Sequence, residues 1–288
     1  MKNKKTEKQK NTLILTALII VLSGILIFRT LNYFKQVTIE TPTAAVKKGP
    51  GIEYAKLKTL KNGSRVTIIH SKYHWFYVKT NDNKFGWIPD WTLATKERNQ
   101  ISDLSDATIV LDPGHGGKDS GALSSKGKME KTYTLRLAKK VAASLRRRGA
   151  KVYMTRTADK FVDLKPRAQL SNEVHADAFI SFHFDSSPGQ DDASGFTTYY
   201  YHKTTSLTLA KSINSQFTAL GLENRGIDFG NFLVIRDNSF PSILLEMGYI
   251  NSTRDFEQIR STSYQNKVSA DVVSGLKNYF AEQNSKTK

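Results

Sequence analysis

The chain has 288 residues, a net charge of +17 and no cysteine. This length suits one or two domains with a buried core. The lack of cysteine excludes disulfides, thiolate nucleophiles and cysteine-type zinc sites, so any bound metal must be held by histidine and carboxylate groups.

The N-terminal segment is basic and then strongly apolar. Residues 1–11 contain five lysines, and the 17 residues from Thr12 to Phe28 carry no charge. No small-residue cleavage site follows, so we predict a basic cytoplasmic tail and an uncleaved single-pass transmembrane anchor over residues 12–32. A cleaved signal peptide is the alternative. Either interpretation places the remaining chain outside the cell, where a cationic protein meets anionic envelope polymers and no nucleic acid.

Residues 41–95 have the pattern of a small all-β barrel. The short runs "RVTII", "WFYVKT" and "FGWIP" alternate with the turn sequences "KNGS" and "NDNK". The segment resembles a bacterial SH3 domain through "KKGPGIEYAKLKTLKNGSRVTI", "WFYVK" and "GWIPDWTL". Five aromatic residues could form a groove for peptide or glycan, namely Tyr73, Trp75, Tyr77, Trp87 and Trp91. The alternative is that Trp75 and Trp87 fill the barrel core.

Residues 96–107 are interpreted as a polar linker, and residues 108–283 as a second domain. Here the apolar runs "TIVLD", "KVYMTR", "AFISFH", "GFTTYYY" and "SILLEMGYI" alternate with helical stretches. This alternation predicts an α/β fold, a twisted sheet with helices on both faces. Ligands of such sheets bind beyond the carboxyl ends of the strands.

Three polar side chains fall at the ends of predicted strands. His115 follows the first strand, while His183 and Glu246 end two others, so we expect them to meet at one edge of the sheet. Glu130 opens the helix after the first strand. Two histidines and Glu130, with water in the fourth position, would form an open zinc site. Glu130 could instead stabilise the helix N-terminus, and Asp119 is a rival ligand.

The second domain resembles the zinc-dependent N-acetylmuramoyl-L-alanine amidases of the Amidase_3 family. Four motifs carry the resemblance in order, "IVLDPGHGGKDSGA", "EKTYTLRLAKKVAASLRRRGAKVYMTR", "RAQLSNEVHADAFISFHFDS" and "PSILLEMGYINSTRDF". It implies that Zn²⁺ is bound by His115, Glu130 and His183 and that Glu246 is the catalytic base. It also implies a peptidoglycan substrate, cleaved between N-acetylmuramic acid and L-alanine. The order of anchor, SH3-like domain and amidase domain is similar to that of staphylococcal cell-wall amidases.

Three further residues are candidates for substrate binding. Arg156 and Arg167 match arginines that recur in the family, and each is interpreted as either a substrate contact or part of a structural ion pair. Asp185 stands where the family usually has asparagine. Its carboxylate would either orient the zinc ligands or change the contacts with substrate.

Regulation and two other functions remain open. Only 63 residues separate His183 from Glu246, and one strand, one helix and a return segment use this span, so we expect no inserted inhibitory helix. Control would then come from the membrane tether, a membrane-protein activator or substrate access. The alternatives to an amidase are a catalytically inactive wall-binding scaffold and a zinc peptidase that cuts within the stem peptide.

Overall fold

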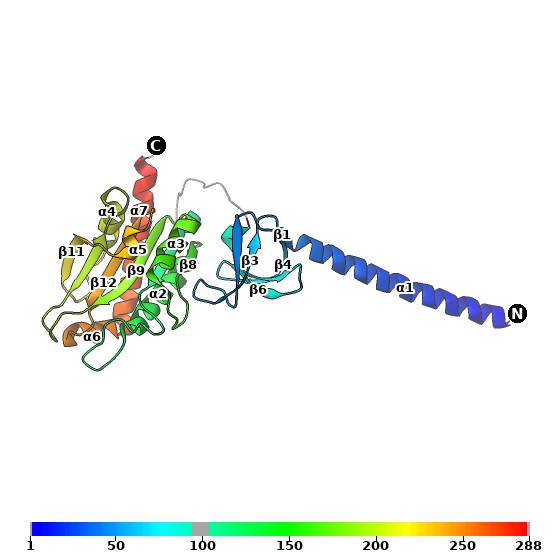
Figure 1. Cartoon of the computed structure of the whole chain (residues 1–288), viewed down its shortest axis with the longest axis horizontal. Coiled ribbons are helices and arrows are strands. Elements are labelled where there is room, and N and C mark those ends of the chain that lie inside the picture. The colour runs from blue at the N-terminus through cyan, green and yellow to red at the C-terminus, as the bar shows by residue number, and fades with distance from the viewer. Residues whose placement is uncertain (1, 94–103, 287–288) are drawn as a thin grey trace. The chain divides into compact units, whose positions relative to one another are not determined.

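A computed structural model describes residues 2–93 and 104–286. The chain divides into two compact units, which comprise residues 1–50 with 56–95 and residues 51–55 with 96–288 (Figure 1). Most of the predicted linker at residues 96–107 lies outside the described residues. The described part of the linker begins with a short 3-10 helix, Leu104–Asp106.

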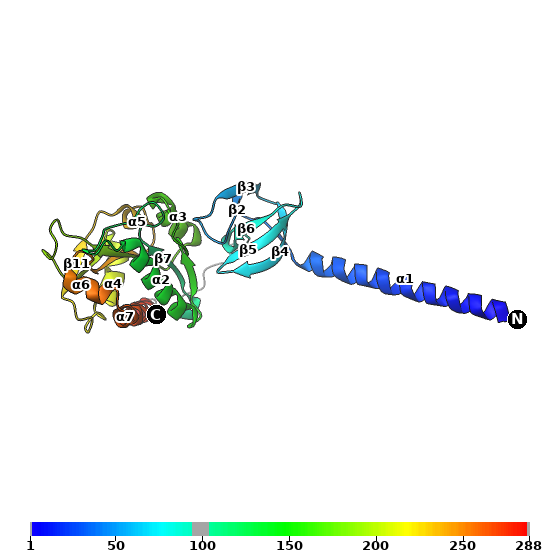
Figure 2. The same ribbon diagram turned by 90° about the horizontal axis from the view of Figure 1, so that it is seen from below.

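The N-terminal segment is one continuous helix, α1 (Lys2–Phe34), which is visible along its whole length in Figure 2. Its Lys10–Thr30 stretch has a mean hydropathy of 2.5 and no buried residue. Among the described residues, α1 is the helix long and apolar enough to cross a membrane. The apolar helix expected over residues 12–32 is therefore present.

Six antiparallel strands form the small barrel in the order β1-β4-β5-β6-β2-β3. The strands are β1 (Gln36–Thr38), β2 (Thr43–Lys47), β3 (Lys56–Lys61), β4 (Arg65–Lys72), β5 (Trp75–Thr80) and β6 (Phe85–Pro89). A 3-10 turn, Asp90–Thr92, follows β6. The barrel starts before residue 41 because β1 pairs with β4. Its core consists of small aliphatic side chains, including Val46, Val66, Val78 and Ile88.

The aromatic residues of the barrel divide into buried and surface groups. Trp75 is 5 % exposed and packs edge-on against Trp91, with 5.4 Å between ring centroids. Trp87 is only half-buried and lies outside the core cluster, beside His70 and Tyr77. Burial was therefore the right expectation for Trp75, whereas the prediction that Trp87 fills the core is wrong.

The second unit is built on a six-stranded sheet in the order β11-β10-β12-β9-β7-β8. Its strands are β7 (Thr108–Pro113), β8 (Lys151–Met154), β9 (Ala178–Asp185), β10 (Phe196–Tyr200), β11 (Asn224–Phe229) and β12 (Ser242–Tyr249). Neighbouring strands are parallel except for the antiparallel pair of β10 and β12. The strand β11 was not predicted, because its glycine and charged residues lack an alternating apolar pattern.

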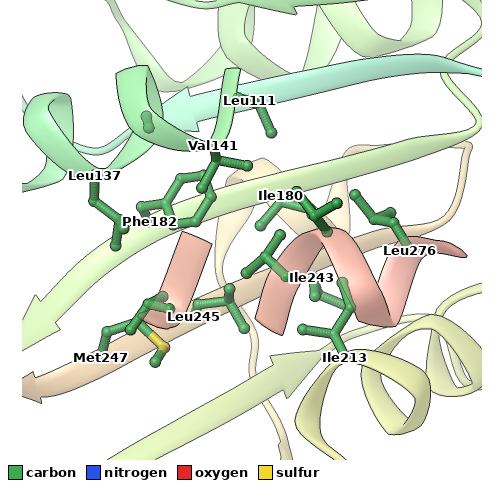
Figure 3. Packing of buried hydrophobic residues seen from close by; sticks show 14 of the residues in the cluster. Leu111, Leu137, Val141, Ile180, Phe182, Ile213, Ile243, Leu245, Met247 and Leu276 are labelled. Atoms are coloured by element: carbon green, nitrogen blue, oxygen red, sulfur yellow. The ribbon is translucent and has the colours of Figure 1, made fainter. Parts of the chain in front are cut away.

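Helices cover both faces of this sheet, as predicted. The helices are α2 (Glu130–Arg146), α3 (Leu164–Val174), α4 (Lys203–Asn214), α5 (Leu233–Arg236), α6 (Thr253–Ile259) and α7 (Thr262–Lys286). On one face, apolar side chains of α2, α4 and α7 meet those of the sheet, and Figure 3 shows Phe182 and Leu245 in this core. Because side chains alternate along a strand, the neighbouring residues His183 and Glu246 point to the other face.

Candidate metal and catalytic site

A glycine-rich loop follows β7 and brings three segments into close contact. A Cβ atom at Gly114 would lie 2.3 Å from Cε1 of His183, and one at Gly121 would lie 2.4 Å from Oε2 of Glu130. Gly121 also has a φ of 65°, which favours glycine. These two glycines are therefore required for the ring of His183 and the carboxylate of Glu130 to approach the loop.

The loop, the start of α2 and the end of β9 place two imidazoles around one carboxylate. His115 Nε2 lies 2.9 Å from Glu130 Oε2, and His183 Nδ1 lies 3.1 Å from Glu130 Oε1. One ligand atom from each residue falls within 4.8 Å of the others. Ligand atoms around a tetrahedral zinc ion lie about 3.3 Å apart, because each bond is about 2.0 to 2.1 Å long. The three side chains could therefore hold a small divalent metal ion.

Hydrogen bonds outside the cluster hold its members in place. Glu130 accepts hydrogen bonds from the backbone amides of Ala122 (2.9 Å) and Phe184 (3.0 Å). His115 Nδ1 pairs with Asp119 Oδ2 at 2.9 Å, which leaves Nε2 directed at the cluster. Such carboxylate–histidine pairs fix the orientation of a metal-binding imidazole. Asp119 is therefore positioned to orient His115, and not to compete with Glu130 as a ligand.

Interactions within the cluster shift the pKa values of Glu130 and His115. Burial acts to raise the pKa of Glu130, but hydrogen bonds to His115 and His183 outweigh it and hold that pKa well below its usual range. For His115, burial acts to lower the pKa, and the carboxylates of Glu130 and Asp119 raise it instead. Glu130 is therefore an ionised carboxylate that is almost fully buried. Such a buried charge is poorly suited to a helix-capping role alone and well suited to binding a cation.

Glu246 stands next to this cluster on β12. It is directly opposite His183 of β9 and Thr197 of β10. Its carboxylate oxygen Oε2 is enclosed and has no hydrogen-bond partner among the described residues. Burial, followed by the negative charges of Glu130 and Asp185, raises the pKa of Glu246 well above its usual value. A carboxylate with raised proton affinity and an oxygen without a hydrogen-bond partner suits proton transfer.

The two arginines support the loop from inside. Arg156 is fully buried and donates to the backbone carbonyls of Pro113 and Gly114, at 3.0 and 2.8 Å. Arg167, 2 % exposed, donates to the carbonyl of His115 at 3.0 Å and to the Asp112 carboxylate at 2.8 Å. Both guanidinium groups are buried and bound to the loop, and Arg167 forms an ion pair with Asp112, so the structure favours the structural interpretation over a substrate contact.

Asp112 was not predicted, although an acidic residue at the end of an apolar strand is a usable signal. It is buried and accepts hydrogen bonds from Ser181 and Thr155 as well as from Arg167. Burial acts to raise the pKa of Asp112, but Arg167 and these hydroxyls keep it low. Losing one partner of such a buried pair typically costs about 3 to 5 kcal/mol. The network therefore fixes the position of the loop that carries His115.

Asp185 lies at the end of β9, paired in register with Tyr249 of β12. Its carboxylate accepts a hydrogen bond from the amide of Ser186 at 2.7 Å. Burial and a hydrogen-bonded contact with Asp185 raise the pKa of Tyr249 to about 12. Among the described residues, the hydrogen bonds found for the Asp185 carboxylate lead to Ser186 and Tyr249, and none leads to His115, Glu130 or His183.

The sheet and its polar edge define an α/β enzyme domain with a metal-competent site beside a buried glutamate. Residues 109–278 match the N-acetylmuramoyl-L-alanine amidase family, and residues 42–94 match the bacterial SH3 domain family. The chain therefore belongs to the N-acetylmuramoyl-L-alanine amidase family. It is an enzyme of this activity, with peptidoglycan as its substrate.

Curated relatives match most or nearly all of the chain. A probable cell wall amidase, LytH, of Staphylococcus epidermidis is 37 % identical over 255 residues, which cover 85 % of this chain and 84 % of the relative. The corresponding protein of Staphylococcus aureus is 35 % identical over 293 residues and covers 97 % of both chains. The resemblance to staphylococcal cell-wall amidases is thus confirmed.

Solved structures agree with the fold of the second unit. The amidase AmiC2 of Nostoc punctiforme is 37 % identical with a TM-score of 0.58, and the match covers 60 % of this chain and 96 % of that one. The CwlD amidase of Clostridioides difficile, solved in complex with the GerS lipoprotein, is 26 % identical with a TM-score of 0.58. That match covers 61 % of this chain and 99 % of CwlD.

Proposed function

We propose that the enzyme is a zinc amidase whose metal is held by His115 Nε2, the carboxylate of Glu130 and His183 Nδ1. The observation that carries this proposal is the convergence of three ligand atoms within 4.8 Å beside Glu246. Two imidazoles and one carboxylate with an open fourth position form a donor set typical of catalytic zinc. Bound zinc would polarise the scissile carbonyl and lower the pKa of a coordinated water.

The protein supplies the proton transfer. Glu246 has an enclosed oxygen without a hydrogen-bond partner, so its carboxylate can accept a proton from the attacking water and deliver it to the leaving amine. The bond we assign is the amide between the lactyl group of N-acetylmuramic acid and L-alanine. The amide nitrogen leaves with the proton that Glu246 carried.

We assign a substrate contact to Asp185. The negative charge of Asp185 raises the pKa of Glu246. The hydrogen bonds described for the Asp185 carboxylate do not involve the proposed metal ligands. Its pairing with the Tyr249 hydroxyl presents one acceptor and one hydroxyl group on the same side of the sheet as Glu246. This arrangement favours the substrate-contact interpretation of Asp185 over a role in orienting the metal ligands.

Mass spectrometry of digested peptidoglycan tests the assigned bond. The amidase should release intact stem peptides that begin with L-alanine and leave glycan strands without peptides. Shortened stem peptides would instead identify a zinc peptidase. The absence of any cleavage by zinc-loaded protein would identify a wall-binding scaffold.

We further propose that α1 anchors the enzyme in the cell membrane with the catalytic unit outside. The apolar Lys10–Thr30 stretch and the basic residues before it support this orientation. We expect the mature chain to keep its full mass and to sediment with membranes, because residues after Phe28 offer no small-residue cleavage site. An intact-mass measurement that shows a loss of about 30 residues would indicate signal-peptide cleavage instead.

A membrane-protein activator is the proposed route of control. Between His183 and Glu246 the chain forms β10, α4, β11 and α5, and α4 packs against α7 on the core face of the sheet. The span therefore contains one helix more than expected, α5, but this helix has only four residues. The CwlD amidase was solved in complex with the GerS lipoprotein, which is a precedent for a partner protein bound to a related fold.

A further inference from the structure

The outer face of the small barrel carries a row of side chains that crosses five strands. Residues directly opposite each other on neighbouring antiparallel strands point to the same face. In register order from β4 through β5, β6 and β2 to β3, the row consists of His70, Tyr77, Trp87, Lys47 and Lys56. Three aromatic rings and two lysines therefore share one surface.

The rings form a continuous cluster. Centroid distances are 4.8 Å between His70 and Trp87, and 5.3 Å from Tyr77 to each of these rings. Phe85 extends the cluster by stacking on Tyr77 at 6.1 Å with an interplanar angle of 20°, and it is 48 % exposed. None of the four belongs to the barrel core. A contiguous cluster of partly or fully exposed rings outside the core is typical of a contact surface.

A glycine makes the lysine end of the row possible. A Cβ atom at Gly86 would lie 2.4 Å from Cγ1 of Val46 and 3.1 Å from the carbonyl oxygen of Lys47. Any larger residue would push β2 away from β6. Gly86 thus keeps Lys47 next to Trp87, with which it pairs across the two strands.

The face is also cationic. Lys79 lies opposite Phe85 on the neighbouring strand and is exposed, as is Lys56 at the end of the row. The nearby carboxylate of Asp82 is bound by Lys58 at 2.9 Å. That carboxylate is therefore engaged away from the row, and it does not cancel the charge of Lys56 and Lys79.

We propose that this aromatic–lysine face (His70, Tyr77, Phe85, Trp87, Lys47, Lys56 and Lys79) binds a phosphodiester polymer that carries sugar rings. Flat rings offer rigid contact area for the apolar faces of sugars, and the lysines on either side match phosphates along a chain. A neutral glycan would not match the positive charges of the exposed residues Lys56 and Lys79. A polyanion without rings would leave the aromatic cluster in water. The inference is independent of the zinc chemistry, because all of these residues belong to the first unit.

The test uses the full chain in detergent micelles and two lipid-free probes, hexose-substituted poly(glycerol phosphate) and the unsubstituted polymer. We expect the substituted polymer to bind at least about fivefold more tightly, which corresponds to about 1 kcal/mol, because only its sugar rings can cover the aromatic cluster. Binding should weaken steeply with salt. Trp87→Ala should remove most of the preference for the substituted polymer, with retention of the fold checked by thermal melting.

A charge-matched pair of variants separates a local site from the overall charge. Lys56→Glu with Lys79→Glu reverses two charges on the face, whereas Lys61→Glu with Arg65→Glu makes the same reversal in the β3–β4 turn. All four side chains are exposed, so neither variant should disturb the core. We expect about a tenfold or greater loss of affinity in the first variant and less than about a twofold loss in the second.

Two outcomes would overturn the proposal. Equal losses in the two double variants would mean that only net charge matters. Equal or tighter binding to anionic lipid vesicles or to phosphate-free peptidoglycan would assign the face to a different partner. Hydrolysis of phosphate-free wall fragments by the Lys56→Glu, Lys79→Glu variant should stay at the wild-type rate, so a failure of the zinc mechanism would remain distinguishable.

Discussion

Glu246→Gln is expected to keep about one zinc ion per chain while turnover falls by about 100-fold or more. Glutamine has nearly the same shape as glutamate but cannot accept the proton of the attacking water. The proposed ligands lie on other elements, and the enclosed oxygen Oε2 of Glu246 has no hydrogen-bond partner among the described residues. Elemental analysis beside a peptidoglycan-release assay, both on the full chain in detergent, measures the two effects separately.

The matched control for this variant is Glu130→Gln. It makes the same chemical change in a carboxylate of the same site, but Glu130 lies between both imidazoles. We expect this variant to lose zinc and activity together. If Glu246→Gln lost zinc while Glu130→Gln kept it, the ligand and the base would have to be exchanged in the proposal.

His183→Ala is expected to lower zinc content and hydrolysis together. Removal of one of three protein ligands weakens the metal site, and the metal contributes several kcal/mol to the transition state. Because each 1.36 kcal/mol corresponds to a factor of ten, we expect activity to fall by about a thousandfold or more. Zinc should dialyse away from this variant under conditions in which the wild-type chain retains it.

His175→Asn provides the control for the loss of a histidine. His175 is exposed and has a φ of 52° at the end of α3, a conformation that asparagine tolerates. His175 precedes β9, whereas His183 lies near the C-terminal end of that strand. The two residues therefore lie at opposite ends of β9. Zinc content and hydrolysis should be unchanged. Wild-type zinc content in His183→Ala would remove this residue from the ligand set.

The local sequence pattern was sufficient to predict the strands and the helix that carry the site residues. Apolar runs that end in a polar residue predicted β7, β9 and β12, and the amphipathic stretch after the glycine-rich loop predicted α2. Parallel strands bring their carboxyl ends together, so the sequence alone predicted that His115 and His183 lie close to each other. The strand β11 was missed because its register is set by pairing with β10, and its own residues show no apolar alternation.

Tertiary contacts decided which polar groups face substrate and which serve the interior. Sequence alone left Arg156 and Arg167 open between substrate contact and ion pair, because both roles use the same long cationic side chain. Burial against the carbonyls of the glycine-rich loop favours the structural role, since a buried guanidinium needs acceptors that only a folded backbone supplies. Tertiary structure also decided the position of Trp87, whose sequence pattern suits core or surface. Only the register of β5 and β6 shows that it shares the outer face with Tyr77.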